Sequence, residues 1–64
     1  MIVNGKEVSL GEGTTLEKYL TDNGYKQGYI AVERNGEIIR KNKYSETILN
    51  DSDKLEIVEF RGGG

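Results

Sequence analysis

The C-terminal stretch KLEIVEFRGGG constrains the fold of this 64-residue chain more than any other part of it. Residues 54–60 alternate as a β-strand does: Leu55 and Ile57 fall on one face, while Val58 and Phe60 lie toward the other. A strand with apolar residues on both faces usually lies in the middle of a sheet. We therefore expect residues 54–60 to form a central strand, with the rest of the chain arranged around it.

Beyond this strand the chain runs on to Gly62, Gly63 and Gly64. Glycine has no side chain whose contacts could offset the roughly 1–2 kcal/mol that ordering a backbone residue costs. The sequence thus predicts a folded domain over residues 1–60 and a flexible tail over residues 61–64. A tail this thin could carry its terminal carboxylate into a narrow channel, so Gly64 is the predicted reacting residue. The alternative is a disordered end without a function, as is common at chain termini.

The composition excludes several kinds of chemistry. The chain has no cysteine and no histidine, which rules out the usual zinc sites, thiol chemistry and histidine-based proton transfer within it. Asp51 and Asp53 lie in a segment with turn composition, so we expect their carboxylates to cap that turn and not to bind a metal.

Charge and hydropathy also limit the partners and the location of the chain. A net charge of −2 and a pI near 5.0 argue against a nucleic-acid partner. No apolar run approaches the roughly 20 residues that cross a bilayer, so no membrane partner is expected. The lack of cysteine and of a visible signal peptide fits a cytoplasmic location.

Two Asn-Gly pairs, at residues 4–5 and 35–36, predict two β-hairpins, because this dipeptide suits the type I′ turn. The first hairpin would place Val3 on the core face and Ile2 on the opposite face. The second would join a strand over residues 29–34 to a return strand that starts at residue 37.

Residues between the hairpins carry the signals of a helix. Thr14 is the predicted N-cap, with Glu17 completing a capping box, and Gly24 is the predicted stop. Helical spacing forms one apolar stripe from Leu16, Tyr19 and Leu20. At about ten residues such a helix is marginal alone and needs a sheet to pack on.

The predicted fold class is α+β: a β-grasp with a four- to five-stranded mixed sheet, covered on one face by one main helix. Since a helix-containing crossover separates the first and last strands, these two can run parallel. Residues 46–49 can add a short edge piece, with Ile48 or Leu49 buried.

With the glycine end added, the whole chain resembles the ubiquitin-like sulfur carriers, most of all the ThiS family of thiamine biosynthesis. The stretches that carry the resemblance are IVNGK at 2–6, TTL at 14–16, IAVERNGEII at 30–39, DSDKLEIV at 51–58 and GGG at 62–64. The chain departs from the family at Ser52, where members commonly have glycine, and at Arg61, where an apolar residue is more usual.

The resemblance implies a carrier and not an enzyme, with no cofactor bound by the chain itself. A partner adenylyltransferase of the ThiF type would use MgATP to adenylate the Gly64 carboxylate, while Gly62 and Gly63 thread its active site. A sulfur donor protein would then convert the carboxyl group to a thiocarboxylate. A thiazole synthase of the ThiG type would receive the sulfur.

Two other functions stay open at this stage. The small subunit of molybdopterin synthase resembles this chain but is usually longer. A ubiquitin-like modifier, joined through Gly64 to lysines of target proteins, has Arg61 as its specific support.

A partner-binding surface is predicted on the sheet face away from the helix, from Ile2, Val58 and Phe60, with Arg61 beside them. Exposed apolar patches often mark partner sites. The alternative is scattered surface hydrophobes without a function. Four basic residues are predicted to form a solvated edge and not a partner contact: Arg34, Arg40, Lys41 and Lys43.

Overall fold

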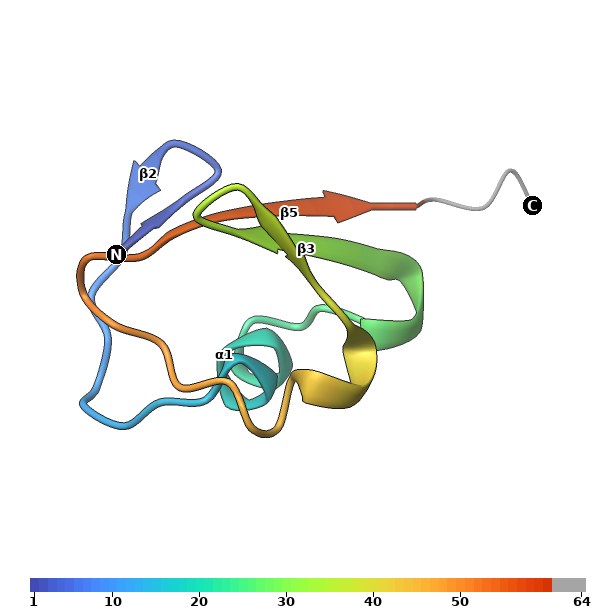
Figure 1. The fold of residues 1–64 in the computed structure, drawn as a ribbon, viewed down its shortest axis with the longest axis horizontal. Coiled ribbons are helices and arrows are strands. Elements are labelled where there is room, and N and C mark those ends of the chain that lie inside the picture. Colours follow the sequence, from blue (N-terminus) through green and yellow to red (C-terminus); the bar gives the residue numbers. More distant parts are fainter. Residues whose placement is uncertain (61–64) are drawn as a thin grey trace.

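A computed structural model describes residues 1–60 and shows a five-stranded sheet with one α-helix packed against one face (Figure 1). In chain order the elements are β1 (Ile2–Val3), β2 (Lys6–Glu7), α1 (Leu16–Asp22), the 3₁₀ turn η1 (Gln27–Tyr29), β3 (Ile30–Arg34), β4 (Glu37–Ile39), the 3₁₀ turn η2 (Lys41–Lys43) and β5 (Lys54–Glu59).

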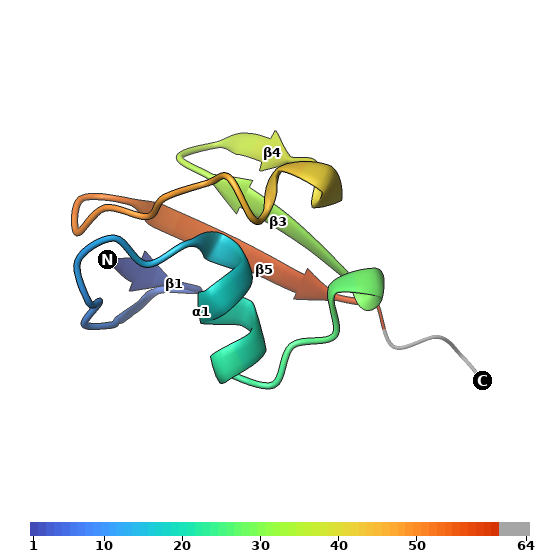
Figure 2. The same ribbon diagram turned by 90° about the horizontal axis from the view of Figure 1, so that it is seen from below.

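The strands lie in the order β2-β1-β5-β3-β4, so the last strand is central, as predicted. Strand β5 runs parallel to β1 and antiparallel to β3. Figure 2 shows α1 in front of this mixed sheet. The helix covers one face of the sheet and leaves the other uncovered, and we call the uncovered one the open face. The architecture confirms the predicted β-grasp.

Both Asn-Gly pairs form the predicted turns. Asn4 and Gly5 have φ of 50° and 82°, and Asn35 and Gly36 have φ of 53° and 87°. Type I′ turns need positive φ at both central residues, which asparagine tolerates and glycine adopts freely. The resulting registers pair Ile2 with Glu7 in the first hairpin, and residues 34 and 37 in the second.

The helix begins one residue later than predicted. Thr15 is the N-cap, since its Oγ1 accepts the Lys18 backbone N–H at 3.1 Å. The Thr14 hydroxyl instead donates to the Gly11 carbonyl at 2.6 Å. The predicted capping box of Thr14 and Glu17 is therefore wrong.

A distant segment sets this helix start. The backbone N–H of Leu16 donates to the Thr47 carbonyl at 2.8 Å, and that of Glu17 donates to the Tyr44 carbonyl at 3.1 Å. Two of the helix's unsatisfied N–H groups thus find partners outside the helix. The segment predicted as a short edge piece forms only an isolated bridge between Thr15 and Ile48, and is not a strand of the sheet.

The helix ends where the sequence predicts. Gly24 has φ of 77°, and its N–H donates to the Thr21 carbonyl at 3.2 Å. The N–H of Tyr25 donates to the Leu20 carbonyl at 2.9 Å. These two bonds form a Schellman motif, in which glycine adopts the left-handed conformation without strain.

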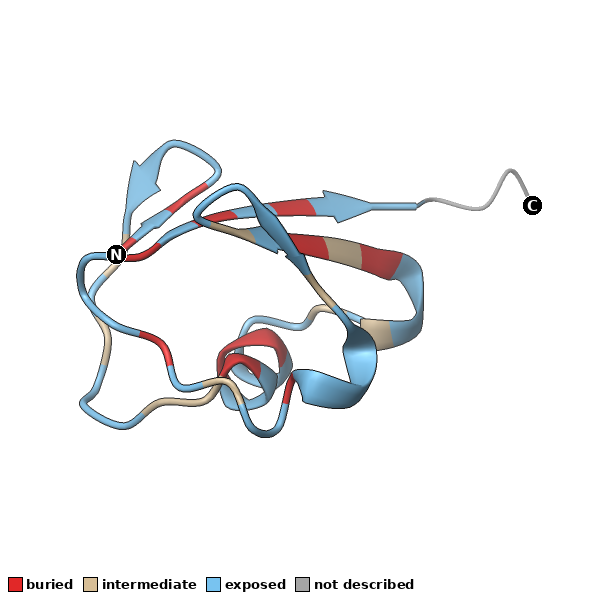
Figure 3. Cartoon of the chain, viewed as in Figure 1, coloured by how far each residue is buried: buried red, intermediate tan, exposed pale blue. Residues whose placement is uncertain are grey.

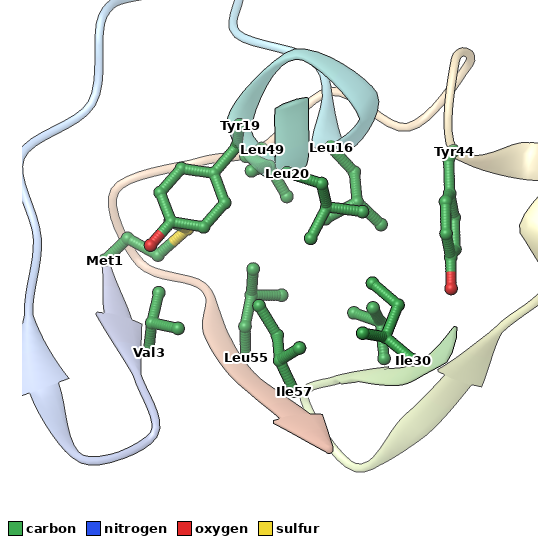
Figure 4. Packing of buried hydrophobic residues seen from close by; sticks show 11 residues of the cluster. Met1, Val3, Leu16, Tyr19, Leu20, Ile30, Tyr44, Leu49, Leu55 and Ile57 are labelled. Carbon is green, nitrogen blue, oxygen red and sulfur yellow. The ribbon is translucent and has the colours of Figure 1, made fainter. Parts of the chain in front are cut away.

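The hydrophobic core lies between α1 and one face of the sheet. In Figure 4, Leu16 and Leu20 of α1 point toward Leu55 and Ile57 of β5. Figure 3 shows that buried residues alternate with exposed ones along β5. The full cluster is Met1, Val3, Leu16, Tyr19, Leu20, Ile30, Val32, Tyr44, Leu49, Leu55 and Ile57. Residues on the opposite face of the sheet are left facing solvent.

A buried carboxylate fastens the turn before β5. Asp53 is only 4% exposed and accepts hydrogen bonds from Arg34 Nε at 2.9 Å, Asn35 Nδ2 at 3.0 Å and the Asn50 backbone N–H at 2.9 Å. Burial by itself raises the pKa of Asp53, but these hydrogen bonds and the Arg34 charge outweigh it and lower the pKa below its ordinary value. The prediction that Asp53 serves its turn is confirmed.

Arg34 is not part of a solvated edge, contrary to prediction, because it forms this ion pair with Asp53. Its Nη2 also donates to the Ile48 carbonyl at 3.0 Å. The other three basic residues of the predicted edge are exposed: Arg40, Lys41 and Lys43.

Candidate functional site

The uncovered face of the sheet carries two of the predicted partner-binding residues. Ile2 is 37% exposed and Val58 is 53% exposed, and each alternates with a buried neighbour in its strand. Ile2 pairs with Lys54, which places it four residues, about 13 Å, along β5 from Val58. Both therefore lie on the predicted face, but they do not converge there, since Glu56 stands between Lys54 and Val58 on that face.

The third predicted residue, Phe60, follows directly after β5. Phe60 is 57% exposed, and its backbone N–H donates to the Tyr29 carbonyl at 2.7 Å. Tyr29 is itself 60% exposed. Because Glu59 pairs with Ile30, β3 supports the central strand to its last residue. Two exposed aromatic residues thus lie beside the point where the glycine tail begins.

The tail itself lies outside the described residues. This applies to Arg61 in the predicted partner surface, to Gly62 and Gly63 as the threading residues, and to Gly64 as the reacting residue. Their roles, the boundary at residue 60 and the flexibility of the tail stay predictions.

A pair of like charges on the open face could not be found from sequence pattern alone. Glu33 of β3 lies directly opposite Glu56 of β5 in the register, and both are exposed. Cross-strand partners have Cβ atoms about 4.5–5.5 Å apart, so two carboxylates there repel each other. Neither forms an ion pair with a described residue. The two carboxylates face each other because of the β3–β5 register, and that register is seen only once the strands are paired in the sheet.

Within residues 1–60 no three acidic side chains gather closely enough to hold a metal ion. Burial raises the pKa of the Tyr44 hydroxyl, and burial together with the nearby Tyr25 raises that of the Tyr19 hydroxyl. Such shifts make both hydroxyls weaker acids. None of the helical segments in this part of the chain has the length and hydropathy of a membrane span.

Together these features define a class of protein: a ubiquitin-like β-grasp domain whose central strand leads into a glycine tail. The ThiS family model matches residues 1–64, and the chain belongs to the ThiS family. The predicted resemblance is thereby confirmed.

Individual relatives agree with this assignment. The chain is 43% identical over 63 residues to the sulfur carrier protein ThiS of Bacillus subtilis, covering 97% of this chain and 96% of that one. The crystal structure of the thiamine biosynthesis protein ThiS from Geobacter metallireducens superposes with a TM-score of 0.82 at 32% identity, covering 98% of this chain and 96% of that one.

A second kind of relative is much longer. The chain is 44% identical over 64 residues to a thiazole synthase of Paramagnetospirillum magneticum, covering 100% of this chain but 20% of the relative. A thiazole synthase of Magnetococcus marinus is 37% identical over 62 residues, covering 97% of this chain and 19% of the relative. The chain thus spans about a fifth of the length of these two proteins.

Proposed function

We propose that this chain is a sulfur carrier of thiamine biosynthesis, acting in the cytoplasm. A partner adenylyltransferase activates the Gly64 carboxylate with MgATP: a carboxylate oxygen attacks the α-phosphorus and pyrophosphate leaves. Hydrosulfide released by a donor protein then attacks the acyl carbon, the bond to AMP breaks, AMP and a proton leave, and a thiocarboxylate results. Thiazole synthase takes up this sulfur.

The observation that carries the proposal is the position of β5. This strand is paired on both edges, by β1 and β3, and the glycine tail follows it directly in the sequence. A tail that starts from the centre of the sheet has a fixed starting point, so a partner that recognises the domain also locates the tail. The match to the Bacillus subtilis carrier along nearly its whole length supports the same function.

The chemistry of the tail fits the role of a co-substrate. An α-carboxyl group has a reference pKa of about 3.3–3.7, so that of Gly64 is ionised at neutral pH. A carboxylate is a poor electrophile, and it needs activation before sulfur can replace an oxygen. Glycine at positions 63 and 64 has no Cβ, which lets the walls of a partner's channel approach the backbone closely.

The proposed thiazole synthase partner draws support from the longer relatives. Two thiazole synthases contain a stretch similar to this chain, which accounts for about a fifth of each. A carrier-like domain joined to a thiazole synthase is expected if the two act together. Membership of the ThiS family likewise favours the thiamine pathway over the molybdopterin pathway.

Intact mass spectrometry tests the proposal. The chain is incubated with the adenylyltransferase of its own genome, MgATP and a sulfur source, and the mass should rise by the difference between sulfur and oxygen. A chain that lacks Gly63 and Gly64 is the control and should keep its mass. An unchanged mass of the parent chain, with an adenylyltransferase shown to be active on another carrier, contradicts the proposal. High-mass conjugates on a denaturing gel would favour the modifier alternative instead.

A further inference from the structure

A hollow of about 330 Å³ lies at the root of the tail, beside the end of β5. Its volume is at the lower end of the range for ligand pockets, about 300–1,000 Å³. A hollow of this volume has room for one large side chain. It lies between the glycine that ends α1, the turn η1 and the last residues of β5. The lining residues are Gly24, Lys26, Tyr29, Ile30, Glu59 and Phe60.

The lining of this tail-root hollow combines aromatic and aliphatic residues with two charged ones. Tyr29 and Phe60 are aromatic residues of the lining and are each more than half exposed, and the lining also includes the buried Ile30. Aromatic residues are enriched among the few residues that supply most of the binding energy in interfaces. Lys26 and Glu59 add one charge of each sign to the lining.

The backbone that carries the hollow is also held by hydrogen bonds before any partner binds. The 2.7 Å hydrogen bond from the Phe60 N–H to the Tyr29 carbonyl joins the two backbones that carry its aromatic residues. Ile30 pairs with Glu59 in the adjacent sheet register. A backbone that is already ordered loses little conformational freedom on binding, which favours affinity.

The length of the tail determines what must cover the hollow. Residues 61–64 follow Phe60, and four residues span at most about 13–14 Å even when fully extended. An enzyme that reacts with the Gly64 carboxylate must therefore bring its active site within that distance of Phe60. The surface of that enzyme then covers the region around Phe60. It need not contact Ile38, which lies on the outer strand β4.

We propose that the tail-root hollow receives an apolar side chain, aromatic or branched aliphatic, from the adenylyltransferase. This inference rests on the proposed function and adds the place where the partner is anchored. Phe60 both lines the hollow and precedes the tail, so filling the hollow sets where the tail enters the active site. Tyr29 is then a specificity residue that the sequence pattern did not single out.

The test uses the full chain and its adenylyltransferase, with pyrophosphate exchange and a binding titration. Tyr29→Ala should raise Kd and KM for the carrier at least about tenfold, in the range of interface hot spots, while kcat at saturating carrier changes less than about twofold. Tyr29→Phe keeps the aromatic ring and should behave as the parent. Ile38→Ala is the matched control, because Ile38 is an apolar residue on β4 that is 72% exposed. The Kd of this variant should stay within about twofold of that of the parent chain.

Each outcome has a defined meaning. The proposed anchor at the tail-root hollow is overturned if Tyr29→Ala leaves Kd unchanged, or if Ile38→Ala loses as much affinity as Tyr29→Ala. In either case, adenylation of the parent chain leaves the proposed function standing. A parent chain that is not adenylated at all removes the proposed function, and this inference with it. Melting curves of the variants check that the loss of binding is not a loss of folding, and Phe60→Ala repeats the test from the other wall.

Discussion

Replacing Asp53 by asparagine should strongly destabilise the domain, although the two side chains are nearly equal in size. All three partners of this buried carboxylate are donors: Arg34 Nε and the Asn50 N–H to Oδ2, and Asn35 Nδ2 to Oδ1. In Asp53→Asn the amide NH₂ must face one of these donors. Asn35 cannot simply turn its amide over, because its Oδ1 already accepts the Lys54 backbone N–H at 2.9 Å.

The expected magnitude follows from these contacts. Breaking a buried ion pair costs about 3–5 kcal/mol when the remaining charge stays buried. The Arg34 side chain is 28% exposed and can reach water, so we expect about 2–3 kcal/mol, comparable to one or two charge-assisted hydrogen bonds. At about 4–8 °C per kcal/mol for a domain of this size, the Tm should fall by about 8–24 °C. This is a large part of the stability of a small domain.

The pH dependence of the Asp53→Asn effect provides a second readout. The pKa of Asp53 is lower in the folded than in the unfolded chain, so its ionised form stabilises the fold above the unfolded pKa of about 3.9. That stabilisation is lost as the pH falls through the folded pKa. The gap in unfolding free energy between parent and Asp53→Asn should therefore be constant above about pH 5 and shrink below about pH 4.

Thermal and urea denaturation followed by circular dichroism measure both effects. Asp51→Asn, in the same turn but exposed, is the matched control and should change stability by less than about 0.5 kcal/mol. A Tm for Asp53→Asn within about 2 °C of the parent would show that the hydrogen bonds of Asp53 add no net stability, and the reasoning above would be refuted.

Three further predictions concern the tail, the open face and the helix start. Gly64→Ala should leave the Tm unchanged but slow pyrophosphate exchange by up to about a hundredfold, because a misplacement near 1 Å can cost that much; an unchanged rate would contradict a tight channel. Glu56→Gln relieves repulsion with Glu33 and should raise the unfolding free energy by about 0.2–1 kcal/mol in urea titrations at low salt, whereas a decrease would show that the pair is not repulsive. Thr15→Ala should lower stability by about 0.5–2 kcal/mol and Thr14→Ala by less; the reverse order would restore the earlier cap assignment.

The sequence alone determined the elements whose signals are local. Turn conformation at the two Asn-Gly pairs depends on dihedral preferences of neighbouring residues, and both hairpins form as expected. The apolar stripe of α1 and its stop at Gly24 depend on residues within one or two turns of each other. The apolar pattern of β5 also predicted its central place in the strand order, although the face with Val58 is exposed and is not covered by the helix.

Tertiary structure decided what depends on partners far away in the chain. Both threonines are suitable N-caps by type, and the hydrogen bonds from Leu16 and Glu17 to residues 47 and 44 are consistent with a start at Thr15. Burial of Asp53 needed the β3–β4 hairpin to bring donors to it. Likewise the β3–β5 register places Tyr29 beside Phe60, and the residues after α1 complete the tail-root hollow. A strand register is settled by packing summed over the whole sheet, which no short stretch of sequence contains.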